Sequence, residues 1–340
     1  MTSESLNKPE GMRGKDINPE EIARQGGGNI SESNSPIVIE QLSKRYGNFM
    51  AVDDLTISVK KNSFTGFLGP NGAGKSTTLK ILTNLIHATS GSAYLNGVDV
   101  TKNSKDALMD VGTVVETPEF YSYLTPVETM MYLGRINGMS KESLSAKIPE
   151  ILQKVKMEDW ANKRIGTFSK GMRQRIALGQ ALLAEPSVII LDEPTSGLDP
   201  RGMIEIREIL KSLKTHDLTI FMSSHMLYEV SDLCDRIAMI NHGKFLVHDT
   251  TEKIMNSAGA RSVKIKVLND LTEDAIRGIT KLPNVVKAEF DGPLIDIRLN
   301  GTDAEQAMLL RDVTALGLDV CSISNDNLES VYLDLIKESR

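Results

Sequence analysis

The chain has 340 residues, a length that predicts two domains or one large domain with an appendage. Hydrophobic residues make up 40% of it and charged residues 25%, which is ordinary for a globular protein, and the net charge of −6 gives no electrostatic reason to expect nucleic acid as a partner. Cys234 and Cys321 lie far apart, and neither they nor the five histidines have metal-ligand spacing. We therefore expect free thiols and no structural metal site.

The first 36 residues are polar and include three consecutive glycines at 26–28. They carry too few large apolar side chains to offset the entropy lost on ordering, so we expect a disordered tail. The N-terminus lacks the apolar core of a signal peptide, and no run of about 18 apolar residues occurs in the chain. These features predict a cytoplasmic protein that works at a membrane only if another protein recruits it.

Short apolar strands alternate with longer helical patterns between residue 37 and about residue 260. This alternation predicts an α/β sheet with helices on both faces. Between about 117 and 185 helical periodicity replaces the strand pattern, which indicates a helical insertion. The elements expected are strands that begin at Ile37 and lie at 64–69, 187–191 and 218–224, helices at 76–86 and 203–214, and a hairpin at 236–249 with its turn at Asn241–Gly243.

The remainder of the chain, residues 262–340, has a different pattern. SVKIKVL, a helical stretch, VVKAEF, LIDIRL, a second helical stretch and LDVCSIS give the order β-α-β-β-α-β. That order is typical of a small ferredoxin-like α+β domain, followed here by a last helix, NLESVYLDLIKES. No pattern in this part indicates chemistry, so we expect a regulatory or dimerising appendage.

The stretch GPNGAGKST matches the pattern G-x-x-x-x-G-K-[ST] and both follows a strand and opens a helix, which is the context that gives the motif meaning. Glycines let backbone N–H groups turn toward phosphates, and the helix N-terminus adds a favourable dipole. Lys75 can reach the β- and γ-phosphates, and the Ser76 hydroxyl can ligate Mg²⁺. The predicted phosphate-binding residues are Gly69, Pro70, Asn71, Gly72, Ala73, Gly74, Lys75, Ser76 and Thr77.

IILDEP places Asp192 and Glu193 at the end of a buried strand. Asp192 suits a hold on Mg²⁺ through water, and Glu193 is placed to orient or deprotonate an attacking water. An acidic pair at a strand end is a weak signal by itself, but beside a phosphate loop it becomes specific. No guanine-reading motif NKxD occurs, which argues against a GTPase.

At FSKGMRQRIALGQALLAEP the sequence resembles the ABC ATPase family, in which a signature of the LSGGQ type opens a helix shortly before the Asp-Glu strand. Ser169 and Gly171 match signature positions, whereas Lys170 and Met172 replace the usual glycine and glutamine. The resemblance covers residues 37 to about 250.

Three further positions are in register with this resemblance. Asp199 lies in SGLDP, which is similar to the family's D-loop, and His225 in MSSHML is similar to its switch histidine. Tyr46 lies where an aromatic ring typically stacks on adenine. The resemblance thus implies an ATPase that uses ATP and Mg²⁺, with Lys75, Glu193 and His225 as its catalytic residues.

The family mechanism implies two partners. The signature serine and its helix would approach the γ-phosphate bound to a second ATPase subunit, so that two chains sandwich two ATP molecules head to tail, as a homodimer here. Single-cassette members mostly power transporters, which implies an integral membrane permease and a place on the cytoplasmic face of the membrane. The permease would contact a surface that includes Phe120, Tyr121, Tyr123, Met130, Met131 and Tyr132.

The run ETPEFYSYLTPVE, the variant signature and the small C-terminal part resemble the exporters of drugs, bacitracin-like antibiotics and bacteriocins. In this comparison Glu116 takes the Q-loop position, normally a glutamine that contacts Mg²⁺ or the attacking water, so a metal role is expected. Two alternatives stay open: an ATPase that drives an importer or a cell-envelope complex, and a non-transport ABC ATPase. The second is disfavoured because the chain carries one cassette and no basic run.

Overall fold

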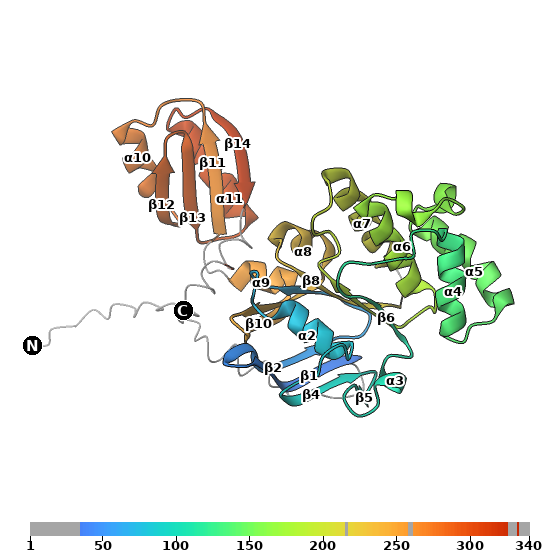
Figure 1. Cartoon of the computed structure of the whole chain (residues 1–340). Helices are drawn as coiled ribbons and strands as arrows, with labels where there is room; N and C mark the ends of the chain where they lie inside the picture. The colour runs from blue at the N-terminus through green and yellow to red at the C-terminus, as the bar shows by residue number, and fades with distance from the viewer. Residues whose placement is uncertain (1–34, 215–216, 258–260, 326–331, 333–340) are drawn as a thin grey trace, which may run out of the picture. The chain divides into compact units, whose positions relative to one another are not determined.

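The computed structural model describes residues 35–214, 217–257, 261–325 and 332 (Figure 1). The expected disordered tail lies outside the described residues except for its last two positions. The last predicted helix also lies outside them except for Tyr332. In the part of the chain that the structure describes, no helix is long and apolar enough to cross a membrane.

A six-stranded sheet runs through the first part of the chain in the order β10-β9-β3-β8-β7-β6. Strand β10 is antiparallel to β9, and the other neighbours are parallel. Parallel strands bring their carboxyl ends to one edge of a sheet, which is where ligands bind in such folds. The strands are β3 Phe64–Leu68, β6 Val111–Val114, β7 Val188–Asp192, β8 Thr219–Ser224, β9 Arg236–Asn241 and β10 Lys244–Thr250.

A second, antiparallel sheet has the order β2-β1-β4-β5. The sequence patterns predict its first strand but not the other three. Strand β2 alternates only over its second half, Leu55–Val59, because Asp54 has a left-handed conformation within an irregular register. Strand β4 opens with Ser-Gly-Ser, and β5 has two residues. The strands are β1 Ile37–Tyr46, β2 Phe49–Val59, β4 Ser90–Leu95 and β5 Val98–Asp99.

Helices cover both faces of the six-stranded sheet, as the alternation predicts. Neighbouring side chains of β8 enter different cores: Phe221 packs with α2 residues such as Leu79, whereas Ile220 packs with residues of α6 and α7. The antiparallel sheet contributes to the first of these cores. The helices outside the insertion are α2 Lys75–Leu82, α3 Ser104–Ala107, α7 Pro200–Leu213, α8 Leu227–Leu233 and α9 Thr251–Ser257.

Between β6 and β7 the described chain is helical, and local sequence signals set where each helix begins. Thr125 and Glu128 form a capping box at α4, Ser140 caps α5, and Ser169 caps α6. The capping oxygens accept backbone N–H groups that the first helical turn leaves unpaired. The elements are α4 Pro126–Ile136, α5 Lys141–Lys154, the short 3₁₀ helices Glu158–Trp160 and Ile165–Thr167, and α6 Lys170–Leu182.

The C-terminal part has the element order β-α-β-β-α-β that its sequence pattern predicts, and its sheet has the order β12-β13-β11-β14. All strand pairs in this sheet are antiparallel. One face packs an aliphatic core that includes Val263, Ile297 and Val313. The elements are β11 Arg261–Val267, α10 Glu273–Thr280, β12 Val285–Asp291, β13 Leu294–Leu299, α11 Asp303–Ala315 and β14 Val320–Asn325.

Candidate active site

The phosphate-loop motif lies between β3 and α2. Gly72 and Gly74 have φ angles of 80° and 104°, in the left-handed region that favours glycine. A Cβ on Gly74 would lie 2.4 Å from the carbonyl oxygen of Ala51, so this position also excludes any side chain by space. The loop therefore turns tightly into α2, whose first N–H groups have no acceptor within the helix and are available to phosphate oxygens.

Lys75 folds back over this loop. Its ammonium group donates to the carbonyl oxygens of Gly69, at 2.9 Å, and Pro70, at 3.1 Å, and lies 3.4 Å from a carboxylate oxygen of Glu193. The lysine is 4% exposed, and a buried ammonium needs such partners because it has lost its water. It is thus placed to contact the terminal phosphates of a nucleotide in the loop.

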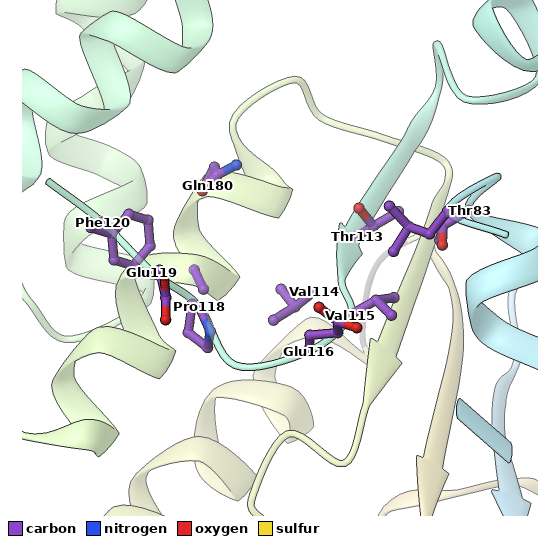
Figure 2. A pocket seen from close by; sticks show the side chains of 11 residues that line it. Thr83, Thr113, Val114, Val115, Glu116, Pro118, Glu119, Phe120 and Gln180 are labelled. Atoms are coloured by element: carbon purple, nitrogen blue, oxygen red, sulfur yellow. The ribbon is translucent and has the colours of Figure 1, made fainter. Parts of the chain in front are cut away.

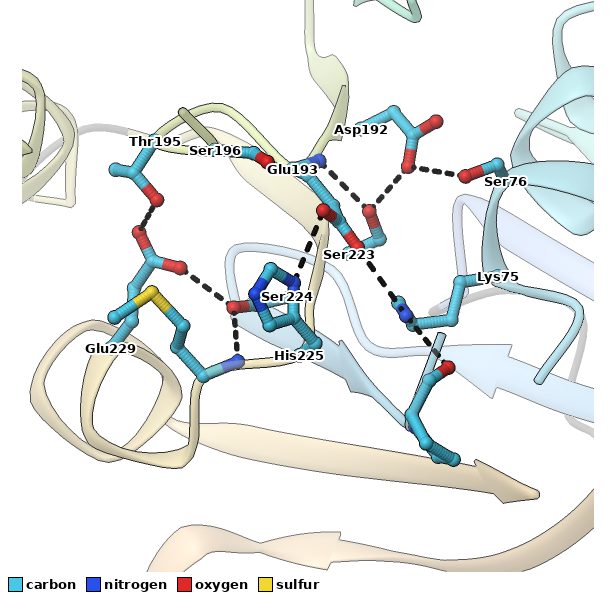
Figure 3. Close-up of polar contacts among 12 residues, drawn as sticks. Lys75, Ser76, Asp192, Glu193, Thr195, Ser196, Ser223, Ser224, His225 and Glu229 are labelled. Carbon is cyan, nitrogen blue, oxygen red and sulfur yellow. Dashed lines mark hydrogen bonds and ion pairs between the residues drawn. The ribbon is translucent and has the colours of Figure 1, made fainter. Parts of the chain in front are cut away.

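Hydroxyl and carboxylate oxygens meet at the end of β7 (Figure 3). Ser76 donates to Asp192 Oδ1 at 3.1 Å, and Ser223 donates to the same oxygen at 2.5 Å. Such hard oxygens beside a phosphate loop fit Mg²⁺, so Ser76 and Asp192 are the residues that would hold it. Among the described residues no group of three or more His, Cys, Asp or Glu side chains could hold a metal ion, so phosphates and water would complete its coordination.

Glu193 follows Asp192 with a left-handed φ of 43°, which turns its side chain from the strand toward Lys75 and His225. Its carboxylate lies 3.4 Å from the lysine Nζ and 3.1 Å from His225 Nδ1 (Figure 3). Burial raises the pKa of Glu193, but the His225 hydrogen bond and the Lys75 charge outweigh burial and hold the pKa below its usual value. The carboxylate is therefore ionised at neutral pH and can accept a proton from water or orient it.

Ser169, Gly171 and Asp199 line one hollow of about 540 Å³. Ser169 caps α6 by accepting from Met172 N, and Asp199 caps α7 by accepting from Gly202 N. No residue of the phosphate loop lines this hollow. The structure thus brings these three predicted residues together, but apart from Lys75 and the rest of the phosphate loop.

Lys170, the lysine that replaces a signature glycine, does not extend freely from α6. Its ammonium group donates to the carbonyl oxygen of Ser196 at 2.8 Å. This bond connects the start of the signature helix to the segment that follows the Asp-Glu pair.

Glu116 forms an ion pair with Lys80, and the sequence patterns do not predict this pair. The carboxylate Oε1 lies 2.5 Å from Lys80 Nζ, and the hydrogen bond raises the pKa of that lysine. Lys80 lies one helical turn after Ser76 on the same face of α2, so the ion pair lies near the expected magnesium site. The Glu116 side chain is 61% exposed and has a left-handed φ of 73°. Its role as a metal ligand stays a prediction.

Glu116 also lines a hollow of about 240 Å³ at the end of β6 (Figure 2). The hollow lies between the β6 end, the segment after it and α6, and its lining includes Thr83, Pro118, Phe120 and Gln180. The ion pair therefore joins one wall of this hollow to the helix that begins at the phosphate loop.

Tyr46 ends β1 and is 46% exposed, with the Lys44 ammonium 5.0 Å from its ring centroid. An exposed ring at the end of a strand is available for stacking, but its role toward adenine stays a prediction.

Several polar residues of the site are absent from the sequence-based set. Each lies near a motif. Three are hydroxyl groups at or just after a strand end, one is a carboxylate in the first turn of α8, and one is a lysine in the last turn of α2. The residues concerned are Lys80, Thr195, Ser223, Ser224 and Glu229.

A glycine loop with a buried lysine, a hydroxyl beside a strand-end aspartate and an ionised glutamate define a phosphate-loop nucleoside triphosphatase. Residues 52–196 match the family model described as ABC transporter. The bacitracin transport ATP-binding protein BcrA of Bacillus licheniformis is 44% identical over 206 residues, which are 60% of this chain and 66% of that protein.

Two further relatives extend the match. The linearmycin resistance ATP-binding protein LnrL of Bacillus subtilis is 32% identical over 301 residues, 87% of this chain and 96% of that protein. The Nod factor export ATP-binding protein I of Burkholderia orbicola is 36% identical and covers 66% of this chain and 73% of its own. The chain belongs to the ABC transporter family, in which it is an ATP-binding subunit with ATPase activity.

Solved structures agree with this assignment. An ATP-binding subunit of an ABC transporter has a TM-score of 0.60 and 28% identity, over 66% of this chain and 94% of that one. An ATP-binding cassette of an ABC transporter in its ADP conformation has a TM-score of 0.58 and 25% identity, over 64% and 92%.

Proposed function

We propose that this chain hydrolyses ATP to power the export of a drug, an antibiotic peptide or a similar amphiphile through a separate permease. The observation that carries the ATPase chemistry is the placement of the Glu193 carboxylate between Lys75 and His225. Support for the cargo class comes from the names of relatives, which refer to bacitracin transport, linearmycin resistance and Nod factor export. The linearmycin relative aligns over 301 residues, well beyond the part that matches the family model.

In the proposed reaction Lys75 and the phosphate loop bind the terminal phosphates. Glu193 orients the attacking water and accepts its proton, while the Nδ1 contact from His225 holds the carboxylate in place. Ser76 and Asp192 would hold Mg²⁺, which neutralises developing charge on the phosphate oxygens when it is bound.

A homodimer completes the proposed site. Ser169 and Gly171 line a hollow to which no residue of the phosphate loop contributes. A nucleotide bound by the phosphate loop of the same chain would therefore not lie in this hollow. In a head-to-tail dimer each hollow receives the nucleotide of the other chain, and ATP then becomes part of the interface. Binding of ATP to the closed state alone would shift the equilibrium toward closure.

The hollow beside Glu116 and the adjoining tyrosines are the proposed contact for the permease. Tyr121, Tyr123 and Tyr132 are 49–63% exposed, and the rings of Tyr123 and Tyr132 each pack against that of Tyr121. Exposed aromatic groups of this kind are typical of protein interfaces. Met130 is a correction to the expected surface, because it is fully buried in the core.

Co-purification tests this proposal directly. The chain, carrying an affinity tag, is expressed in its own cells and isolated from detergent-solubilised membranes with Mg²⁺ and ATP present. A polytopic membrane protein should accompany it and place it at the cytoplasmic face of the membrane. Resistance of the cells to antibiotic peptides should fall when either gene is deleted.

Two outcomes would contradict the proposal in different ways. Uptake of a nutrient that depends on the captured protein would favour the importer alternative. Absence of any membrane protein, with the chain bound to ribosomes or DNA instead, would favour a non-transport ATPase. A Tyr121→Ser, Tyr123→Ser variant should lose the membrane protein while keeping ATP binding, since neither tyrosine touches the phosphate loop.

A further inference from the structure

Glu229 is a buried carboxylate that the proposed hydrolysis leaves without a role. It lies in the first turn of α8 and is 3% exposed. Its two oxygens accept hydrogen bonds from Thr195 Oγ1, at 2.5 Å, and Ser224 Oγ, at 2.6 Å (Figure 3). No lysine or arginine among the described residues forms an ion pair with it. Since burying a carboxylate is costly, the two hydroxyl groups are essential to this arrangement.

The direction of these bonds follows from the neighbouring donors. Ser224 Oγ accepts the N–H of Met226 at 3.0 Å, so the single hydroxyl proton of Ser224 is free to be donated to Glu229. Thr195 is 2% exposed and directs its hydroxyl to the other carboxylate oxygen. Both carboxylate oxygens are thereby used, and the group joins two separate loops.

Consecutive serines at the end of β8 serve different partners. Side chains alternate across a strand, and Ser223 binds Asp192 Oδ1 and the N–H of Glu193 while Ser224 binds Glu229. The Asp-Glu pair at the end of β7 and the loop after it are therefore held to β8 at two places.

The loops that Glu229 joins are those that carry the proposed catalytic contact. Thr195 is two residues beyond Glu193, and Ser224 directly precedes His225. The Glu193 carboxylate and His225 Nδ1 are 3.1 Å apart, so a small relative shift of the two loops would break their hydrogen bond. Figure 3 draws the Glu229 contacts beside this one.

We infer that Glu229 is a positioning residue for ATP hydrolysis. It ties the loop after Glu193 to the loop that carries His225 and thereby sets the distance between these two side chains. It does not touch the nucleotide or the attacking water. The inference rests on the proposed roles of Glu193 and His225.

A double-mutant cycle on the full chain tests this inference. The variants are Glu229→Gln, Thr195→Val and the two combined, with Thr195→Ser as the variant that keeps the hydroxyl. Thr65→Val is the matched control, because Thr65 is also a buried threonine with a hydroxyl bond, to Ser63 in the same segment, and lies outside the site. For each variant we would measure the kcat of ATP hydrolysis, nucleotide affinity by titration calorimetry, and Tm.

The expected result is a kcat lowered about tenfold or more by Glu229→Gln and by Thr195→Val, with nucleotide affinity within about twofold of wild type. The double variant should be little worse than either single variant. Glu229→Gln replaces one acceptor oxygen with an NH2 donor, and Thr195→Val removes a hydroxyl donor, so both weaken the same connection. Thr195→Ser should restore kcat, and Thr65→Val should leave it unchanged.

Other outcomes would overturn the inference. Multiplicative losses in the double variant would mean that the two residues act independently. If Thr65→Val lowers Tm as much as Thr195→Val does and also lowers kcat by the same factor, the effect on kcat is one of general destabilisation. Glu193→Gln, measured in parallel, distinguishes failure of this inference from failure of the proposed function. If Glu193→Gln keeps wild-type turnover, the catalytic assignment is wrong. If Glu193→Gln is inactive and the losses in the double-mutant cycle are multiplicative, only the role of Glu229 is wrong.

Discussion

The nucleotide-binding part, residues 37–257, and the C-terminal part, residues 261–325, differ in what they bury. The C-terminal core consists of aliphatic side chains, and Ser262 is the single buried polar residue among those described in that part. The nucleotide-binding part buries charged and hydroxyl groups, including Lys75, Ser224 and Glu229. Lys75, Ser224 and Glu229 lie at or just after the carboxyl ends of β3 and β8, whereas other buried polar residues, such as Thr129 and Arg175, lie in the helical insertion.

The difference indicates where this chain buries polar groups, at a cost in stability, because the reaction needs them at fixed positions. A buried polar group is destabilising unless its hydrogen bonds are satisfied, so a sheet edge that keeps several of them has a use for their positions. A core like that of the C-terminal part has only packing to satisfy. We therefore expect substitutions at the polar edge to change activity strongly and removal of the C-terminal part to change it little.

The largest effect is expected at Glu193. Glu193→Gln removes the carboxylate that accepts a proton but keeps the size of the side chain, so hydrolysis should fall by about 10²–10⁴-fold. ATP binding should persist, because Lys75 and the phosphate loop are unchanged. The variant should accumulate as an ATP-bound dimer on size-exclusion chromatography, and a monomer with wild-type turnover would contradict the assignment.

Substitutions at Lys75 and Ser169 should affect two different steps, ATP binding by the monomer and ATP-dependent dimerisation. Lys75→Ala removes a buried ammonium from the phosphate loop and should abolish ATP binding in the monomer. Ser169→Arg changes the separate hollow at the start of α6 and should spare monomer binding while blocking the ATP-dependent dimer. Titration calorimetry on dilute protein gives the first result and light scattering the second. Equal loss of monomer binding in both variants would contradict the head-to-tail arrangement.

His248 tests whether a partly buried polar group away from the nucleotide affects only the stability of the fold. Burial, with the nearby charge of Arg236, lowers the pKa of His248 to about 4, and its Nε2 accepts from Arg236 Nε at 3.4 Å. Between pH 6.5 and 4 the unfolded chain binds a proton that the native chain does not. The free energy of unfolding should therefore fall as the pH falls through this window, by about 3 kcal/mol at most.

The measurement is urea denaturation at pH 7 and pH 5 for wild type and His248→Gln. The variant should lose part of the pH dependence, and the exposed His87→Gln should not. An identical pH dependence in wild type and both variants would mean that His248 is not held neutral by the fold.

A smaller effect is expected at Glu116. Glu116→Gln removes the ion pair with Lys80 and the negative charge near the magnesium site, while ATP binding and much of the hydrolysis should remain, since they depend on Lys75, Mg²⁺ and Glu193. The Mg²⁺ concentration that gives half-maximal turnover should shift a few-fold, and more so with the permease present. Glu119→Gln, in the same hollow but without the ion pair, is the control. Superimposable curves for wild type and Glu116→Gln would mean that the glutamate is neither a ligand nor a relay.

The sequence predicts the position of a motif in the fold well where one short stretch contains a whole chemical unit. The loop at 69–77 needs no distant partner to be recognised, and the pair Asp192–Glu193 becomes specific once that loop is found. The loop lies between β3 and α2, and the pair lies at the end of β7, as the patterns predict. The Lys80–Glu116 and Thr195–Glu229 contacts join segments 34–36 residues apart, and no local pattern encodes which of many charged or hydroxyl side chains will meet.

The fold shows the same limit. The apolar runs Val188–Leu191 in β7 and Ile220–Met222 in β8 are evident because their strands are buried on both faces. The strands β2, β4 and β5 are less evident: a bulge divides β2 so that it alternates only over Leu55–Val59, β4 opens with Ser-Gly-Ser, and β5 has two residues. Met130 was assigned to a surface for a related reason, since methionine is equally suited to an interface and to a core.

The smallest effect on the nucleotide site is expected from removal of the C-terminal part. The buried residues of 261–325 form a cluster of their own, with no member in the cores of the nucleotide-binding part. A chain that ends at Ser257 should therefore fold and bind ATP with unchanged affinity. In this shortened chain, Glu193→Gln should still abolish most of the ATPase activity. Tyr332 is half-buried against the larger of those cores, so a small fall in Tm is expected, and Tyr332→Ala in the full chain should reproduce it. The truncated chain could instead be insoluble, or it could fail to bind ATP while the Tyr332→Ala variant still binds it. Either result would mean that the two parts depend on each other for folding. The contrast between the two parts would then concern only the composition of their cores.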